Sequence, residues 1–363
     1  MIGVLCTSYP RSLDDHAGSF VRTRVRALVA AGEVLEVIAA GAGSGGSEPN
    51  LRVFRVPTMG AAEIFYAGGA PEALESGSLR QRVRAWLEAA QFTARMMALA
   101  AQRAAGWSAV ESHWLVPSAL VACVVAPHLH HRAHAHGGDV FLLARVPGGA
   151  SLARFLCHSG VELVFASADL RDRFARLCGS NPEALGARTC VQPAPHDSWL
   201  FRPRPSAERH DLRRQLGLDG FAVLAAGRLV PIKGFDVLVR AVGHLPARAR
   251  PILTIVGAGP EEPRLRRLAA ACAVDLRLPG LLSPAVLAEW MAAADLFVHP
   301  CRPLPNGRSE GAPVVVREAL AAGLSAIASS VGGLPELAGH QRLSLVAPED
   351  PFALAAKIAS AMA

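Results

Sequence analysis

The sequence predicts an α/β protein of two domains, each built on a parallel β-sheet. Short apolar runs bounded by turn residues recur along the chain. Each run precedes a longer stretch with helical periodicity, a pattern typical of strands and helices that alternate around parallel sheets. The 363 residues also exceed the ~250 to 300 at which a single hydrophobic core stops growing. We therefore expect an N-terminal domain at 1–195 and a C-terminal domain at 206–363, joined by the proline-rich linker 196–205.

The apolar runs place the expected strands, because each run is short, rich in aliphatic residues and bounded by turn residues. In the first half, strands are expected at 2–7, 34–39, 51–56, 109–112, 132–136 and 163–166; in the second half, they are expected at 222–226, 252–256, 275–278, 296–299 and 325–328. Doubly wound sheets bind ligands at the carboxyl ends of their strands. Two such domains facing each other would form a central cleft, and we expect the chemistry to take place there.

Composition and charge restrict the class of partner. The hydrophobic fraction of 51% and the charged fraction of 18% are typical of a folded globular protein. A formal net charge of +7 favours anionic partners. Nucleic acid is not expected, because the basic residues form no block and only two tyrosines are available for base stacking. Phosphorylated small molecules and anionic lipid surfaces remain as partners.

Several features of the sequence favour a cytoplasmic protein. The seven cysteines form no C-x-x-C pair and are expected to be reduced thiols. The N-terminus lacks the basic region and the cleavage site of a signal peptide. The apolar run 115–127 is shorter than the ~20 residues that span a bilayer. The amphipathic stretch 79–103 could rest on anionic lipid at the inner face of the membrane, although a helix packed on its own sheet is the alternative that we favour.

The segment RPLPNGRSEGAPVVVREALAAG, at 302–323, carries the most informative residues. Pro313 suits the first turn of a helix and Gly323 suits its end, so the spacing predicts a helix over 313–322. The N-terminus of such a helix attracts anions, which favours a ligand diphosphate. Glu310 and Glu318 would then accept hydrogen bonds from sugar and ribose hydroxyls. The alternative for each glutamate is a solvated side chain near a helix end.

A second cluster is GRLVPIKG at 227–234, directly after an expected strand. Arg228 and Lys233 can neutralise the two charges of a diphosphate, and the glycines let the backbone approach the ligand. An ordinary basic surface loop is the alternative reading of this cluster.

The segment TIVGAGPEEPRLRRL from Thr254 invites comparison with a dinucleotide-binding fingerprint. Gly257 and Gly259 follow an expected strand, but Glu262 occupies the position where G-x-G-x-x-G requires its third glycine. Nicotinamide or flavin binding is therefore not supported. The chain also lacks the G-x-x-x-x-G-K-[ST] pattern of a P-loop nucleotidase.

Taken in order, EGAPVVVREA at 310–319, GRLVPIKG, VGAGP and VGGLPEL at 331–337 resemble the family-4 retaining glycosyltransferases. TSYPRSLDDHAGSFV, SHWLVPSAL and HAHGGDV support the resemblance in the first half. The resemblance implies the GT-B fold, in which two Rossmann-like domains face a central cleft. It also implies an N-terminal domain on the acceptor side and a C-terminal domain that binds the nucleotide sugar.

The resemblance also implies roles for individual residues. Arg228 and Lys233 would bind the donor diphosphate, Glu310 the transferred sugar and Glu318 the ribose. His136 would lie beside the reacting sugar, as a contact and not as a nucleophile. The backbones of Gly311, Ala312 and Val314 would hold sugar and phosphate. Leu278 and Leu281 would contact the base. Gly18 would approach the donor phosphate or the acceptor.

The histidines around His136 raise a zinc hypothesis. His130, His131, His134 and His136 lie close in sequence, and alternate positions of a strand share a face. No C-x-x-C or H-E-x-x-H pattern accompanies them, and the chain contains no D-x-D pair to hold a metal-bound donor. We therefore expect no metal and no other cofactor.

The expected function is transfer of a sugar from a UDP- or GDP-type nucleotide sugar with retention of configuration. The departing diphosphate can accept the acceptor's proton on the same face of the sugar, so no enzymic nucleophile is needed. The acceptor is expected to contact loops at 7–20 and 63–75, and its class stays open among a glycan, a lipid carrier and a small molecule. Two alternatives are a nucleotide-sugar epimerase or hydrolase of the same fold and a non-catalytic sugar-nucleotide-binding subunit.

Overall fold

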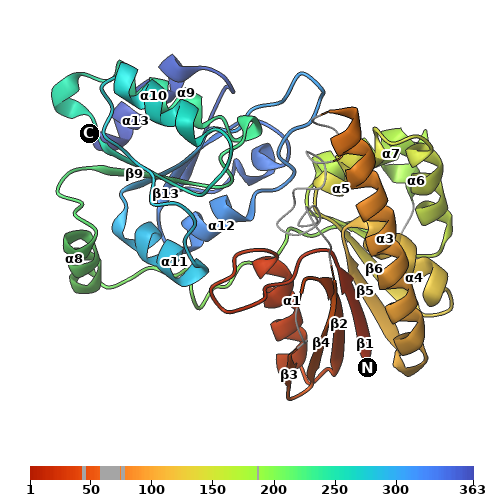
Figure 1. Cartoon of the computed structure of the whole chain (residues 1–363). Helices are drawn as coiled ribbons and strands as arrows, with labels where there is room; N and C mark the ends of the chain where they lie inside the picture. Colours follow the sequence, from red (N-terminus) through yellow and green to blue (C-terminus); the bar gives the residue numbers. More distant parts are fainter. Residues whose placement is uncertain (43–45, 58–73, 75–77, 186–187) are drawn as a thin grey trace. The chain divides into compact units, whose positions relative to one another are not determined.

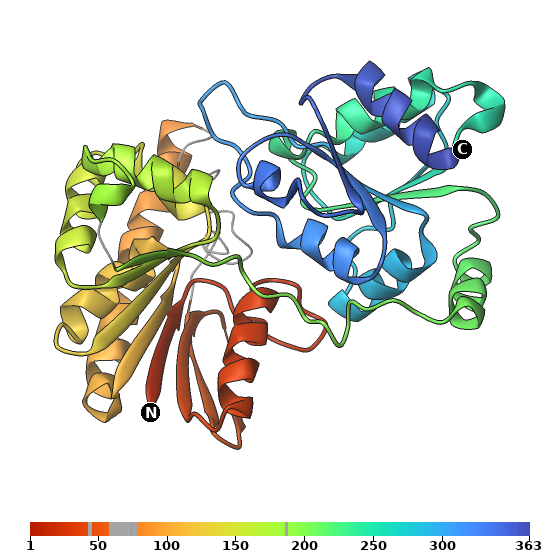
Figure 2. The same cartoon turned by 180° about the vertical axis from the view of Figure 1, so that it is seen from behind.

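The computed structural model describes all residues except 43–45, 58–73, 75–77 and 186–187. The expected acceptor loop 63–75 therefore lies outside the described residues, apart from Leu74. Contacts between residues divide the chain into two compact units, unit 1 at Met1–Pro195 and unit 2 at His196–Ala363 (Figures 1 and 2). Residues 196–205, expected to form a linker, contribute Phe201 to the core of unit 2.

Unit 1 is built on an eight-stranded sheet with the order β3-β4-β2-β1-β5-β6-β7-β8. Neighbouring strands are parallel, except that β3 pairs with β4 in antiparallel fashion. The strands are β1 (Ile2–Cys6), β2 (Leu35–Ala40), β3 (Ser47–Glu48), β4 (Leu51–Val56), β5 (Ala109–His113), β6 (His130–Ala135), β7 (Glu162–Phe165) and β8 (Thr189–Val191). The helices are α1 (Ser19–Ala30), α3 (Leu79–Arg103), α4 (Leu120–Val125), α5 (Gly138–Leu143), α6 (Gly149–His158) and α7 (Ala168–Cys178).

Both faces of this sheet are covered. Alternate side chains of β1 separate into two cores, so that Leu5 packs with α3 and α4 on one face while Val4 packs with α1 on the other. The helix α3 begins with a capping box between Ser78 and Gln81 and buries the stripe that contains Phe92 and Met96. Covering both faces with helices is what a parallel sheet of near-continuous apolar strands requires.

Unit 2 is built on a six-stranded parallel sheet with the order β11-β10-β9-β12-β13-β14. Its strands are β9 (Ala222–Ala226), β10 (Ile252–Val256), β11 (Leu276–Arg277), β12 (Leu296–His299), β13 (Ser325–Ser329) and β14 (Leu343–Val346). Its α-helices are α8 (Ser206–Gln215), α9 (Phe235–His244), α10 (Glu262–Ala271), α11 (Pro284–Ala293), α12 (Val314–Ala321) and α13 (Pro351–Met362). One core joins α8, α11 and α12 to one face of the sheet, and a second core joins α9, α10 and α13 to the other.

Every strand expected from the sequence is present, with ends displaced by at most two residues. The strands β3, β8 and β14 were not expected. One detail of the helix predicted over 313–322 is wrong, because Pro313 is the N-cap of α12 and has an extended backbone (φ −65°, ψ 114°). Gly323, at φ 82°, ends the helix as expected. Among the described residues, no helix is long and apolar enough to cross a bilayer.

Candidate functional site

In unit 2, the loops that follow β9, β10, β12 and β13 share one edge of the sheet, because the strands are parallel. These loops contain the four motifs of the C-terminal half. The loop after β9 is held against the loop after β10 by backbone contacts. Leu229 N donates to Ala258 O at 2.9 Å, and Gly227 N donates to Val256 O at 2.9 Å.

Glycines make this close approach of the two loops feasible. A Cβ atom at Gly257, where φ is 142°, would lie 1.9 Å from the carbonyl oxygen of Gly227. A Cβ atom at Gly259, where φ is 158°, would lie 2.4 Å from the carbonyl oxygen of Leu229. The two glycines of VGAGP therefore support the GRLVPIKG loop, which accounts for the motif without a dinucleotide.

The turn that carries Glu310 is held in the same way by VGGLPEL. A Cβ atom at Gly332, where φ is 55°, would lie 1.7 Å from the carbonyl oxygen of Glu310. Gly333 N donates to Gly311 O at 2.7 Å. The backbone of Glu310 and Gly311 thus rests directly on the loop after β13.

The structure brings Lys233 and Glu310 into direct contact. Lys233 Nζ lies 2.9 Å from Glu310 Oε1, and the two side chains are 15% and 14% exposed. Burial alone would raise the pKa of Glu310, but the charges of Lys233 and its neighbours hold the pKa below its usual range. Glu310 is therefore an ionised carboxylate, which can accept hydrogen bonds.

His299 is a further residue of this site, and sequence reasoning missed it. It ends β12, it is fully buried, and neither ring nitrogen has a hydrogen-bond partner within the described parts of the chain. Burial, and then the charge of Lys233, lower the pKa of His299 to about 3, so the ring is neutral. The run LFVH has the composition of an ordinary buried strand. The one signal in the sequence was a polar residue, His299, at the carboxyl end of that strand, where parallel sheets bind ligands.

Glu318 lies on α12 and is half-buried. Burial, together with the charge of Asp197, raises the pKa of Glu318 to about 7. Of the residues expected to hold sugar and phosphate, Gly311 is buried, Ala312 is half-buried and Val314 is the first residue of α12.

The remaining donor-side residues lie on the adjoining loops. Arg228 is half-buried in the loop after β9. Leu278 packs against the core that contains α9 and α10, while Leu281 is 56% exposed. Gly257 N donates to Gly280 O at 2.9 Å, which ties the loop of Leu278 and Leu281 to VGAGP.

In unit 1, His136 directly follows β6 and is set in an aromatic environment. Its Nε2 lies 3.0 Å from His113 Nδ1, and its ring packs against Phe20 and Trp114 with centroid distances of 4.7 and 5.1 Å. Burial, and then the charge of His134, hold the pKa of His136 well below its usual value. The ring of His136 is therefore neutral.

Two loop features fix the surroundings of His136. The buried carboxylate of Asp139 accepts hydrogen bonds from the backbone of Leu115, Gly137 and Val140 at 2.8 to 3.1 Å. Gly18, at φ 72°, begins α1, and a Cβ atom there would lie 2.3 Å from the carbonyl oxygen of Ser8. A glycine is needed at position 18 because the two ends of the loop between β1 and α1 approach each other closely there.

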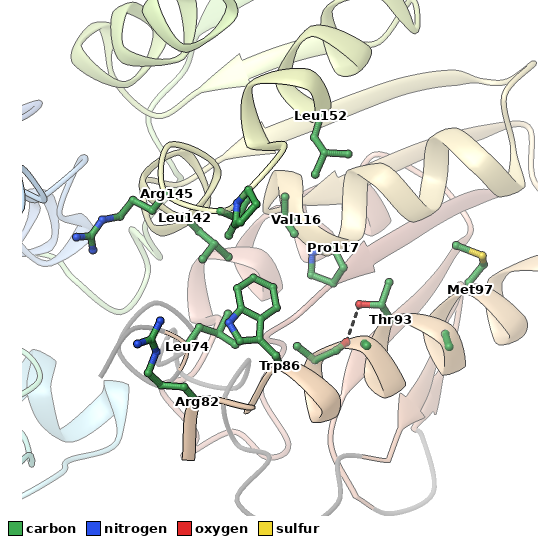
Figure 3. Close-up of a pocket in the computed structure, with 15 residues that line it drawn as sticks. Leu74, Arg82, Trp86, Thr93, Met97, Val116, Pro117, Leu142, Arg145 and Leu152 are labelled. Atoms are coloured by element: carbon green, nitrogen blue, oxygen red, sulfur yellow. Dashed lines mark hydrogen bonds between the residues drawn. The ribbon is translucent and has the colours of Figure 1, made fainter. Parts of the chain in front are cut away.

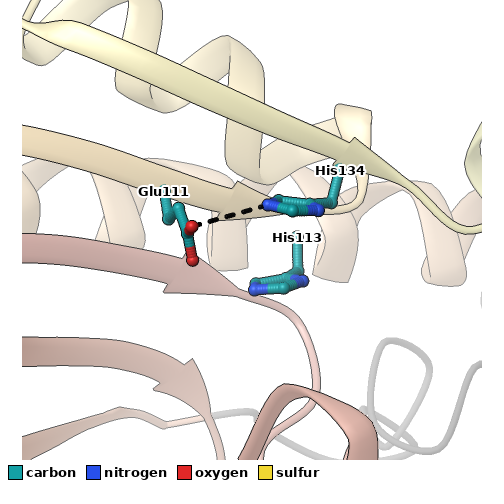
Figure 4. A group of neighbouring side chains, drawn as sticks. All are labelled: Glu111, His113 and His134. Carbon is teal, nitrogen blue, oxygen red and sulfur yellow. Dashed lines mark ion pairs between the residues drawn. The ribbon is translucent and has the colours of Figure 1, made fainter. Parts of the chain in front are cut away.

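The four histidines of the zinc hypothesis do not converge. The side chain of His130 is 68% exposed, and His131 shares a 2.7 Å hydrogen bond with Ser112. His134 instead lies beside Glu111 and His113 (Figure 4).

Unit 1 also contains a cavity of about 1020 Å³ between α3, α5 and the residues that follow β5 (Figure 3). Its apolar wall includes Trp86, Pro117 and Leu142, and Arg82 and Arg145 also line it, on the left side of the view in Figure 3. The first turns of α3 beside this cavity expose an apolar stripe. The exposed fractions of its side chains are 74% for Leu79, 50% for Val83, 42% for Trp86 and 67% for Leu87.

Residues 220–363 match the sequence profile of the glycosyl transferases group 1 family. The chain is 35% identical, over 219 residues, to a GDP-mannose-dependent alpha-(1-6)-phosphatidylinositol monomannoside mannosyltransferase of Mycobacterium tuberculosis; the match covers 59% of this chain and 55% of that protein. It is 30% identical, over 315 residues, to a D-inositol 3-phosphate glycosyltransferase of Xylanimonas cellulosilytica, covering 79% of this chain and 67% of that protein. The chain thus spans about half the length of the mannosyltransferase relatives that it matches.

The fold has close counterparts among solved structures. The structure of HepE from Anabaena in complex with UDP superposes with a TM-score of 0.69 and 17% identity, covering 99% of this chain and 88% of that one. At this identity the likeness shows a common fold, with two parallel-sheet α/β domains.

Proposed function

The chain belongs to the glycosyl transferases group 1 family, and from this premise we propose that it transfers a hexose from a nucleotide diphosphate sugar to an acceptor with retention of configuration. The contact between Lys233 and Glu310 carries the proposal. It places one cation and one carboxylate together at the edge of the sheet where parallel α/β domains bind ligands. The cation suits a leaving diphosphate, and the carboxylate suits the hydroxyls of the sugar.

In this proposal the chain positions the reactants and stabilises charge. Arg228 and Lys233 neutralise the diphosphate as it leaves, Glu310 orients the sugar, and Glu318 binds the ribose. The diphosphate accepts the proton of the acceptor hydroxyl on the same face of the sugar. This route needs neither an enzymic nucleophile nor a metal at the donor. His136, neutral and held by aromatic packing, contacts the sugar from unit 1.

The donor is of the GDP or UDP type. GDP-mannose is the first candidate, because relatives 33% to 35% identical to this chain are named as GDP-mannose-dependent. UDP-sugars are the second candidate, since HepE binds UDP on the same fold. Glu310 recognises hydroxyls that both kinds of donor present.

For the acceptor, we propose a lipid carrier with an anionic head group. The apolar cavity would receive part of the lipid, and Arg82 and Arg145 would face its head group. The exposed stripe from Leu79 to Leu87 would rest on an anionic membrane surface, as amphipathic helices with basic residues do. The match to a phosphatidylinositol mannoside mannosyltransferase supports this choice over a free glycan or a small molecule.

The central test replaces Lys233. Loss of one preorganised charge contact typically costs about 10² to 10³ in rate, so Lys233→Ala and Arg228→Ala should each lower kcat for sugar transfer by that factor. Lys357→Ala is the matched control, because this lysine is exposed on α13. Transfer is measured with GDP-mannose and UDP-glucose against acceptor lipids in vesicles. Near wild-type turnover of both site variants would rule out the diphosphate assignment.

Product analysis separates the alternatives. An epimerase or hydrolase would convert the donor without an acceptor, whereas a transferase forms a glycosylated product only when an acceptor is present. A non-catalytic subunit would bind the donor, visible as a thermal shift, without turnover of any donor and acceptor pair.

A further inference from the structure

Three ligand-type side chains gather on one face of the unit 1 sheet. Glu111 and His113 are alternate residues of β5, so their side chains point to the same face. His134 is the register partner of His113 on β6. All three residues are buried, and one ligand atom from each lies within 4.8 Å of the others (Figure 4).

Two nitrogens of this cluster lack a hydrogen-bond partner among the described residues. They are His113 Nε2 and His134 Nε2, and both are buried. The carboxylate oxygen Oε1 of Glu111 lies 3.7 Å from His134 Nε2, an ion-pair contact that is longer than a hydrogen bond (Figure 4). Buried polar atoms are nearly always paired. The lone pairs of these two nitrogens, beside a carboxylate, are therefore suited to a bound cation.

The carboxylate of the cluster is held by Arg24, whose Nε and Nη2 atoms both donate to Glu111. Arg24 Nη2 lies 2.5 Å from Glu111 Oε1, which keeps the carboxyl group ionised. Two imidazoles and one carboxylate form a ligand set typical of zinc sites that keep an open fourth position.

We propose that Glu111, His113 and His134 bind one divalent transition metal, zinc or a metal of similar preference, through the carboxylate and the two Nε2 atoms. This departs from the expectation that the chain binds no metal. The rings of His113 and His134 are stacked, with centroids 4.7 Å apart and an interplanar angle of 14°, so both rings turn when their Nε2 atoms bind one ion. Arg24 then orients the carboxylate as an outer-shell partner, and its charge keeps the affinity below that of closed structural zinc sites.

The site has a consequence for His136. A metal on His113 Nε2 requires the ring proton to reside on Nδ1, and that nitrogen lies 3.0 Å from His136 Nε2. His113 therefore donates to His136 Nε2, and the remaining proton of a neutral His136 resides on its Nδ1. The metal makes His113 a positioning residue that fixes the tautomer of His136. Only this consequence for sugar transfer rests on the proposed function.

The test measures metal binding by the full chain without any sugar nucleotide, so its result does not depend on whether the chain transfers sugar. Protein freed of metal by chelator is titrated with Co²⁺, followed by visible absorption, and then with Zn²⁺, followed by metal analysis after desalting. We expect one metal per chain. His113→Ala and His134→Ala should each weaken Co²⁺ binding by at least ~10-fold, as a lost outer-shell partner alone already does.

His130→Ala is the matched control, because its side chain is exposed on the same strand as His134. Circular dichroism of the metal-free variants shows whether they fold, and Glu111→Gln, which keeps the shape of the side chain, replaces any variant that does not. NMR of the imidazole nitrogens should show Nδ1 of His136 protonated in the loaded protein. Absence of saturable binding in the wild type, or equal binding by His113→Ala, His134→Ala and His130→Ala, would overturn the proposal.

Discussion

Replacing Gly332 by alanine should both destabilise the chain and impair sugar transfer, because this glycine supports the turn of Glu310. The added Cβ atom would lie 1.7 Å from the carbonyl oxygen of Glu310, whereas real Cβ atoms essentially never approach below 3.0 Å. The two backbones must therefore separate by about 1 Å, a misplacement that can lower rates about 10²-fold. Alanine at φ 55° also costs about 1 to 2 kcal/mol through its backbone conformation alone.

Two control glycines of unit 2 separate these effects. Gly307 has a φ of 79° and free space around its Cβ position, so Gly307→Ala measures the conformational cost alone. Gly339 has free space and no positive φ, so Gly339→Ala should behave as wild type. We expect Gly332→Ala to lose more than ~3 kcal/mol of unfolding free energy, since a backbone clash adds to the conformational cost. Urea unfolding and kcat/KM are measured for all three, and equal losses in Gly332→Ala and Gly307→Ala would refute the reasoning.

Three further predictions concern titration, a buried charge and a pair of thiols. The raised pKa of Glu318, about 7, means that its stabilising effect is fully present below the unfolded-state pKa near 4.5 and is lost as the pH rises through 7. The unfolding free energy of Glu318→Gln relative to wild type should therefore rise between pH 5 and pH 8, and an unchanged difference would contradict the assignment. Arg103→Ala removes the nearer of the two cations that face the fully buried carboxylate of Glu36 and leaves Arg52 at 3.9 Å. It should cost about 3 kcal/mol of unfolding free energy, against less than ~0.5 kcal/mol for replacing the exposed Arg84, which pairs with Glu88. Equal urea midpoints of the two variants would argue against this prediction. Cys157 Sγ and Cys178 Sγ lie 3.4 Å apart, and a hydrogen bond from Cys178 lowers the pKa of Cys157 to about 7. Diamide, which removes one hydrogen from each thiol, should convert this pair to a disulfide and lower the mass by ~2 Da in wild type but not in Cys157→Ser.

The sequence predicted the two sheets well, because buried parallel strands appear as short apolar runs. The strands β3, β8 and β14 were missed because SE, TCV and LSLV are interrupted by polar residues or are too short to form an apolar run. The proximity of Lys233 and Glu310 followed from motif order and parallel topology. Pro313 was misplaced by one position, because both the N-cap and the first helical turn tolerate a missing N–H.

Other parts of the site depend on tertiary packing that spacing does not encode. His299 is assigned to the site only because the fold buries it beside Lys233 and Glu310, which makes its ring neutral. Glu111 and His113 stand more than 20 residues before His134, and only the pairing of β5 with β6 brings them together. The apparent set of four neighbouring histidines was misleading, because His131 points to a different face and bonds Ser112.

The main-chain contacts among the loops of unit 2 have a consequence for engineering. Gly257, Gly259 and Gly332 lie directly against the carbonyl oxygens of Gly227, Leu229 and Glu310, so these contacts between loops involve main-chain atoms only. A designer who wishes to alter the preferred nucleotide should leave these glycines untouched and vary Leu281, whose side chain projects from a loop tied to Gly257. In the proposed donor site, substitutions at Leu281 would change the surface next to the base, while the main-chain contacts beneath the loop stay the same.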